Sequence, residues 1–144
     1  MVAAVTGVAL GAGCRLALAC DVRIVADDAR LGLKEVRYAL LPGLGGTAAL
    51  PRLVGRERAP DLMVTGREWS GAEAVGLGLA LRALPAGGVL AAARDYAAEV
   101  AQAPRVAVAH IKAAVDVADW DRNLAAAAVG QTACIRAAAG SLPS

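Results

Sequence analysis

The chain is poor in several residue types that mark whole classes of protein. Its 144 residues include no phenylalanine and a single histidine, His110, and only 3% of them are aromatic. Lys and Arg exceed Asp and Glu by only 15 to 13, which leaves a formal net charge of +2. Proteins that bind nucleic acid present clustered basic residues, often with aromatic side chains between them. The basic residues here are scattered, so we expect no nucleic acid among the partners.

Cysteine is scarce and odd in number, with Cys14, Cys20 and Cys134. The first two lie six positions apart on what reads as one short helix, on roughly opposite sides of it. This pattern argues against a disulfide framework and indicates a reducing compartment, so we expect a cytoplasmic protein. The uncharged opening run ends at Arg15, short of the roughly 20 residues that a membrane-spanning helix needs. We therefore expect no membrane partner.

Clusters of metal ligands and of nucleophiles are also lacking. His110 lies in an apolar stretch without an acidic or cysteine neighbour, which is more typical of a packed or surface histidine than of a ligand. The glycine-rich stretches at 11–13 and 43–46 lack the spacing of a dinucleotide-binding turn. We accordingly predict no metal and no separate cofactor.

Apolar residues make up 58% of the chain, enough for one packed domain. Short β-branched runs predict strands, and glycine- or serine-headed apolar runs predict helices. Ser70 followed three residues later by Glu73 has the form of a capping box. The expected strands are 2–5, 22–26, 29–33 and 79–85, and the expected helices are a short one between the first two strands, 41–55 after its glycine turn, 59–66, and one after Ser70.

From about residue 86 the pattern becomes entirely helical and rich in alanine. Helices are expected at 88–103, at 105–118 after Pro104, and at about 121–139. Their small apolar residues exceed what exposed helices need, which is typical of a face buried between subunits.

The stretch GAG at 11–13 begins the first predicted helix. A glycine turn at a helix N-terminus exposes unpaired backbone N–H groups with the positive end of the helix dipole behind them. Such a turn can hold an anion or a developing oxyanion. Close packing of helix on strand is the alternative, and it explains such glycines more often.

The stretches AAVTGVALGAGCRLALACDVRIVADDARLGLKEVRYALLPGLGGTAALPRLVG and LMVTGREWSGAEAVGLGLALRAL resemble the enoyl-CoA hydratase/isomerase, or crotonase, superfamily over residues 2–85. The resemblance implies an α/β fold, a crotonase-like spiral of β-β-α units with a helical C-terminal region. It also implies acyl-CoA thioester substrates, CoA being part of the substrate, and a homotrimer or a dimer of trimers. We expect a partial spiral core at 1–86 and a helical trimerisation region at 87–144.

The resemblance assigns roles to residues at the two glycine turns. Ala12 stands where the family's backbone N–H donates to the thioester oxygen, between Gly11 and Gly13, which would contribute to substrate binding. Pro42 and Gly43 match the turn that shapes the acyl pocket.

One position departs from the family pattern. The family's hydratases carry two glutamates; Glu35 matches one, and Arg15 stands at the position of the other. Hydration needs two carboxyl groups to orient water and move protons, and a guanidinium accepts no proton at physiological pH. A single carboxylate suffices for double-bond isomerisation. The side chain of Arg15 either points at Glu35 or extends to solvent.

Two function classes follow. The first is an enzyme of this family, more isomerase-like than hydratase-like, in which Glu35 moves a proton and the Ala12 N–H stabilises an enolate. The second is a non-catalytic acyl-CoA-binding or subunit-interaction protein that keeps the fold. Against the family pattern, an N-terminal part and the last C-terminal helix are expected to be missing, as in a truncated or degenerate relative.

Overall fold

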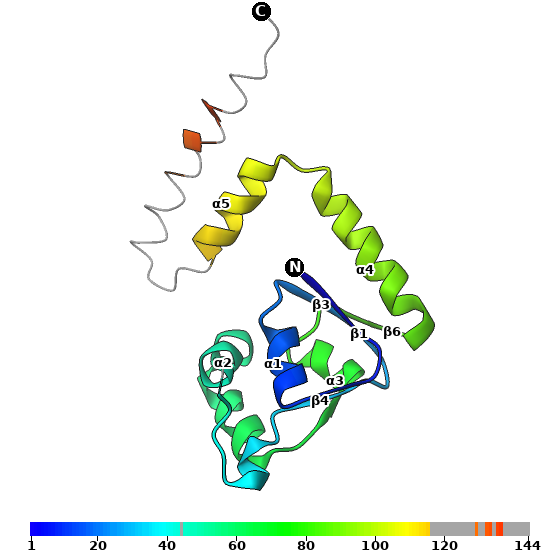
Figure 1. The fold of residues 1–144 in the computed structure, drawn as a ribbon, viewed down its shortest axis with the longest axis vertical. Helices are drawn as coiled ribbons and strands as arrows, with labels where there is room; N and C mark the ends of the chain where they lie inside the picture. Colours follow the sequence, from blue (N-terminus) through cyan, green and yellow to red (C-terminus); the bar gives the residue numbers. More distant parts are fainter. Residues whose placement is uncertain (44, 116–128, 130–131, 134, 137–144) are drawn as a thin grey trace, which may run out of the picture. The chain divides into compact units, whose positions relative to one another are not determined.

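The computed structural model describes residues 1–43, 45–115, 129, 132–133 and 135–136. The chain packs as two units, Met1–Asp95 and Tyr96–Ser144, each of which is described by itself. Figure 1 shows the strands and the helices α1 to α3 in the first unit. The expected boundary between a spiral core and a trimerisation region at residues 86–87 stays a prediction.

Two three-stranded sheets form the frame of the first unit. The first is entirely parallel, in the order β1-β3-β6, and the second, β2-β4-β5, pairs β2 with β4 in parallel and β4 with β5 in antiparallel fashion. Successive strands alternate between the sheets up to β4, so the chain winds as a spiral. The strands are β1 (Val2–Val5), β2 (Val8–Leu10), β3 (Val22–Ala26), β4 (Arg30–Gly32), β5 (Trp69–Ser70) and β6 (Arg82–Leu84).

The predicted strands at 2–5, 22–26, 29–33 and 79–85 are confirmed, the last two over shorter spans. The strand β3 lies in the middle of its sheet, and Ile24, Val25 and Ala26 are fully buried, as the apolar residues of the strand predict. The strands β2 and β5 were not expected. They have three and two residues, too few to show an alternating pattern, and they form because β4 offers both of its edges.

The helices of the first unit follow the predicted glycine and serine signals. They are α1 (Ala12–Leu18), α2 (Gly46–Thr65) and α3 (Gly71–Gly76), with a 3-10 turn, η1 (Glu35–Tyr38). The helix α4 (Ala86–Ala101) begins in the first unit and ends in the second. A non-helical Gly55 interrupts α2, which agrees with the prediction of two separate helices at 41–55 and 59–66. The helix α1 ends at Leu18, so the expectation that Cys20 lies on it is wrong.

Local capping fixes where these helices begin and end. The hydroxyl of Ser70 accepts from the N–H of Glu73, whose carboxylate accepts from the N–H of Ser70, which confirms the capping box at the start of α3. Gly66 ends α2 in a left-handed conformation with φ 55°.

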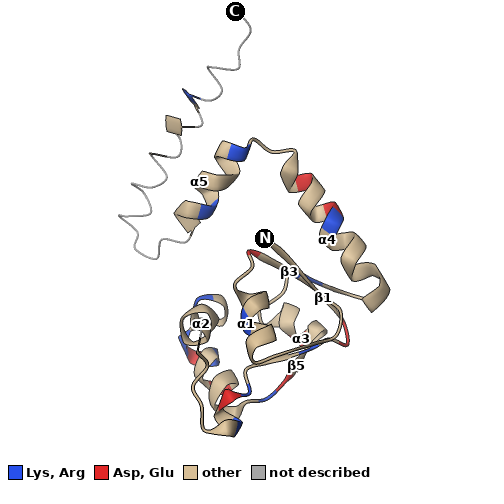
Figure 2. Cartoon of the chain, in the orientation of Figure 1, with Lys and Arg blue, Asp and Glu red and all other residues tan. Residues whose placement is uncertain are grey.

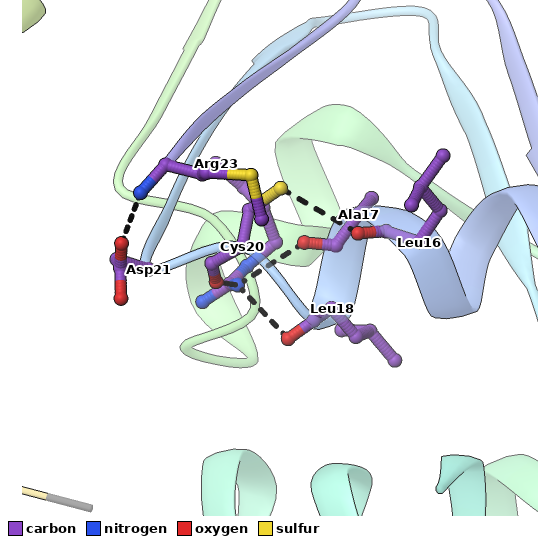
Figure 3. A network of polar contacts seen from close by, with 7 residues as sticks. Leu16, Ala17, Leu18, Cys20, Asp21 and Arg23 are labelled. Atoms are coloured by element: carbon purple, nitrogen blue, oxygen red, sulfur yellow. Dashed lines mark hydrogen bonds and ion pairs between the residues drawn. The ribbon is translucent and has the colours of Figure 1, made fainter. Parts of the chain in front are cut away.

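A buried arginine joins β3 to the C-terminal end of α1. Arg23 is only 7% exposed, and its Nη1 donates to the carbonyls of Cys20 at 2.6 Å, Ala17 at 3.3 Å and Leu18 at 3.5 Å (Figure 3). Its Nε donates to the carbonyl of Leu79. The guanidinium thus satisfies carbonyls that the helix leaves without an internal partner, and its charge favours that end of the helix dipole.

The second unit includes α5 (Arg105–Val115), which confirms the helix predicted after Pro104 over its described part. The helix predicted at about 121–139 lies largely outside the described residues. Figure 2 shows Lys and Arg spread over several elements rather than gathered on one. Within the part of the chain that the structure describes, no helix combines the length and the apolarity that crossing a bilayer requires.

Candidate active site

The turn before α1 is held by its own backbone. Gly11 adopts φ 52° and ψ −115°, a conformation with a positive φ that favours glycine. Its N–H donates to the carbonyl of Gly32 at 2.9 Å, and its carbonyl accepts from the N–H of Arg15 at 3.0 Å. The first N–H groups of the helix, beginning at Ala12, have no carbonyl within the helix to bind. Ala12 and Gly13 are exposed residues.

Glu35 begins the turn η1 and directs its carboxylate at this glycine. A Cβ atom added at Gly11 would lie 3.5 Å from Oε1 of Glu35, within van der Waals contact, so the carboxylate lies directly against this glycine. The side chain of Glu35 is 12% exposed. Both of its oxygens are buried and lack a hydrogen-bond donor. A buried carboxylate without a donor is costly for folding, and such groups are concentrated at functional sites.

Arg15 lies on the same face of α1, one turn after Gly11. Its Nε is 3.6 Å from Oε1 of Glu35, and its side chain is 15% exposed. The separation makes an ion pair but not a hydrogen bond, and Nε is buried without a hydrogen-bond acceptor. Of the two expectations for Arg15, the structure therefore supports the one in which it points at Glu35.

The second glycine turn packs against the other side of Arg15. A Cβ atom at Gly43 would lie 3.3 Å from Nη1 of Arg15, and one at Gly46 would lie 3.3 Å from its Cδ. The same atom at Gly46 would lie 3.0 Å from Cβ of Pro42, which is buried. Gly43 itself is exposed. The guanidinium of Arg15 is thus held between a carboxylate and bare backbone.

Cys14 lies in the core next to this cluster, and it is fully buried. Burial raises the pKa of its thiol to about 11, and the negative charge of Glu35 adds to the effect. The thiol therefore stays neutral and is not a nucleophile at neutral pH.

The residues expected to form the site from sequence are separated along the chain, and the structure brings most of them together. Gly11, Arg15, Glu35, Pro42 and Gly43 form one cluster, with Ala12 and Gly13 beginning the helix beside it.

Two further glycines serve the site in ways that the sequence analysis did not assign. The carbonyl of Gly32 anchors the first turn, and the bare Cα of Gly46 leaves room for the stem of Arg15. Only the glycine pattern of the second turn could have indicated Gly46, and no sequence signal marks Gly32.

Among residues 1–43, 45–115 and the few described beyond them, no group of His, Cys, Asp and Glu could hold a metal ion. The chemistry on offer is that of one carboxylate, one guanidinium and the free N–H groups of a helix start.

Comparison with known proteins agrees with the resemblance seen in the sequence. The family model described as enoyl-CoA hydratase/isomerase matches residues 1–135. A probable enoyl-CoA hydratase of Mycobacterium bovis is 44% identical over 115 residues, which cover 80% of this chain and 45% of that protein.

Solved structures agree as well. An enoyl-CoA hydratase from Bacillus anthracis superposes with a TM-score of 0.90 and 38% identity, over 94% of this chain and 54% of that one. A candidate enoyl-CoA hydratase from Thermobifida fusca, solved in complex with CoA, gives a TM-score of 0.89 and 36% identity, over 97% of this chain and 56% of that one. The chain spans about half the length of these three proteins.

Proposed function

This chain belongs to the enoyl-CoA hydratase/isomerase family and has the crotonase fold, and from that premise we propose that it binds acyl-CoA thioesters. The observation that carries the proposal is the carboxylate of Glu35, buried without a hydrogen-bond donor beside the Gly11 turn. The CoA bound by the similar Thermobifida fusca protein supports the same class of ligand. CoA enters as part of the substrate, so no separate cofactor is proposed.

The thioester oxygen would accept from the N–H of Ala12. That N–H has no partner within α1, and a backbone donor needs no particular side chain, so alanine can serve as well as glycine. Gly11, Gly13, Pro42 and Gly43 would line the path of the acyl chain. A donor aimed at the oxygen stabilises the negative charge that develops when the thioester becomes an enolate.

Glu35 would move a proton along the acyl chain. Its carboxylate removes a proton from the carbon next to the thioester of a 3-enoyl chain, and the electron pair of that C–H bond shifts toward the thioester oxygen. The same carboxyl group then returns the proton to the fourth carbon, and the double bond moves into conjugation. One carboxyl group completes this cycle, with no water and no second acid.

Hydration fits the site less well. It needs a second carboxyl group facing the first, and here that place holds the guanidinium of Arg15, 3.6 Å from Glu35. The guanidinium can neither take a proton from water nor return one to carbon. Isomerisation is therefore the reaction that we propose.

The test is the conversion of a 3-enoyl-CoA to the conjugated 2-enoyl-CoA, followed by the absorbance of the conjugated thioester. Glu35→Gln keeps the size of the side chain and removes the base, so it should reduce turnover at least about 100-fold. Glu68→Gln removes a carboxylate outside the site and should retain activity. Undiminished turnover in Glu35→Gln would refute the role of Glu35.

Arg15 also favours a second candidate, a non-catalytic acyl-CoA-binding or subunit-interaction protein. An ion pair that neutralises the carboxylate of Glu35 is compatible with binding alone. Binding of an acyl-CoA by the chain without turnover of any enoyl-CoA would select this candidate over the enzyme.

Assembly and location complete the proposal. We propose a homotrimer or a dimer of trimers, because α4 and α5 are rich in small apolar residues and α5 exposes Ile111 and Val115 at 63% and 75%. Sedimentation velocity at micromolar concentration would detect this assembly, and a monomer would refute it. A cytoplasmic location is proposed from the sparse cysteines.

A further inference from the structure

The guanidinium of Arg15 is the one feature of the site that the proposed reaction leaves unused. It is placed among the groups that would contact substrate, between the carboxylate of Glu35 and the turn at Gly43. Its Nε is buried and makes no hydrogen bond. The proposed reaction does not explain why a cation lies in this position.

The ion pair between Arg15 and Glu35 contributes little to the stability of the folded chain. Two charges taken out of water repay their desolvation only when the geometry is good and hydrogen bonds satisfy the remaining atoms. Here the closest approach is 3.6 Å, and Nε of Arg15 and both oxygens of Glu35 are left without hydrogen bonds. The ion pair therefore lacks hydrogen bonds. A carboxylate placed closer to the guanidinium of Arg15 would accept hydrogen bonds that Glu35 does not accept.

The guanidinium of Arg15 adjoins an exposed turn. Nη1 lies against Gly43, where a Cβ atom would come within 3.3 Å, and the stem packs over the bare Cα of Gly46. Gly43 is exposed, so this side of the guanidinium adjoins the surface rather than the core. The planar fork of arginine matches a carboxylate with two parallel hydrogen bonds, which a lysine at the same place could not provide.

We propose that Arg15 binds a carboxylate carried by the acyl chain, so that the preferred ligands are CoA thioesters of dicarboxylic acids. This inference rests on the proposed function, since it takes the acyl chain to pass between Ala12 and Glu35. The substrate carboxylate replaces Glu35 as the partner of Arg15. Glu35 then no longer pairs with the guanidinium and can face the acyl chain.

Binding of non-reacting probes to the purified chain tests the inference. Malonyl-, succinyl- and glutaryl-CoA are each compared by calorimetry with the neutral thioester of the same length, namely propionyl-, butyryl- and pentanoyl-CoA. At least one dicarboxylic thioester should bind about tenfold tighter than its neutral counterpart, as a charge-assisted hydrogen-bonded pair allows. The monoamide of that thioester should lose the advantage, because it has the same shape without the charge.

Variants then assign the effect to Arg15. Arg15→Gln should abolish the preference while retaining affinity for the neutral thioester, and Arg15→Lys should keep part of it. Arg82→Gln removes the same charge from an exposed position on β6 and should leave the preference intact.

The outcomes separate the inference from the proposed function. Equal affinity for dicarboxylic and neutral thioesters, or a preference that survives Arg15→Gln, overturns the inference and leaves acyl-CoA binding in place. Failure of every thioester to bind overturns both.

Discussion

Nε of Arg15 and Oε1 of Glu35 lie 3.6 Å apart, on elements separated by twenty positions in the chain. One comes from the second turn of α1 and the other from the start of η1. Their contact sets a guanidinium beside a carboxylate in the candidate site. In the proposed function, it places a cation where hydration would need a second carboxyl group.

The first prediction concerns hydration. Because a guanidinium stands where a second carboxyl group is needed, the chain should hydrate a short 2-enoyl-CoA at less than about 1 turnover per second, the low end of ordinary enzymes. Loss of enoyl absorbance with purified protein measures this rate. Faster turnover would show that the reaction proceeds without the missing carboxylate.

A second prediction reverses that substitution. Arg15→Glu places two carboxyl groups in the site and should raise the hydration rate at least about tenfold above that of the unmodified chain. The double variant Arg15→Glu with Glu35→Gln is the control and should lose the gain. If the single and double variants hydrate equally fast, Glu35 is not the partner of residue 15.

The third prediction concerns Arg23, which caps the C-terminal end of α1. Arg23→Ala leaves the carbonyls of Cys20 and Leu79 without their donor in a buried place, and should lower the free energy of unfolding by about 2–4 kcal/mol. Denaturant unfolding measures the loss. Arg82→Ala, at an exposed position on β6, should change it by less than about 0.5 kcal/mol. Similar losses in the two variants would show that the cap contributes nothing.

A fourth prediction concerns acid stability. Hydrogen bonds from Arg30 and Lys34 lower the pKa of Glu68 from 4.5 to about 2. A carboxyl group whose pKa is depressed by folding stabilises the folded state fully above pH 4.5 and loses that contribution as the pH falls toward 2. Glu68→Gln should therefore flatten the pH dependence of the unfolding free energy between pH 4.5 and 2.

The control for that experiment is Glu57→Gln, which removes an exposed carboxylate of α2. It should keep the slope of the unmodified chain more closely than Glu68→Gln does. Thermal unfolding followed across this pH range compares the three proteins. An unchanged slope in Glu68→Gln would mean that solvent screens these ion pairs completely.

The fifth prediction concerns thiol reactivity. In the folded chain at pH 8, iodoacetamide should modify Cys20, which is partly exposed, and spare Cys14, whose thiol is fully buried with a pKa of about 11. Mass spectrometry of the tryptic peptides distinguishes the two. Both should react after denaturation, and rapid labelling of Cys14 in the folded state would show that the core at α1 opens.

The sequence by itself determined the elements whose signals are local. The β-branched residues of β3, the Ser70 and Glu73 capping box and the helix end at Gly66 each depend on residues within a few positions of one another, so their patterns predicted them correctly. Motif order also indicated the fold and the identity of most site residues, because the glycine turns and Glu35 occur in a characteristic arrangement.

The tertiary structure alone decided what depends on partners distant in the chain. The strands β2 and β5 form because β4 pairs with both of them. A pattern of two or three residues is too short to predict such strands from the sequence. The sequence allowed the side chain of Arg15 to extend either to solvent or to Glu35. In the folded chain the turn at Gly43 and Gly46 packs against this side chain, which lies beside Glu35. The orientation of a long side chain depends on how segments distant in the sequence pack around it. That packing is defined only in the folded chain.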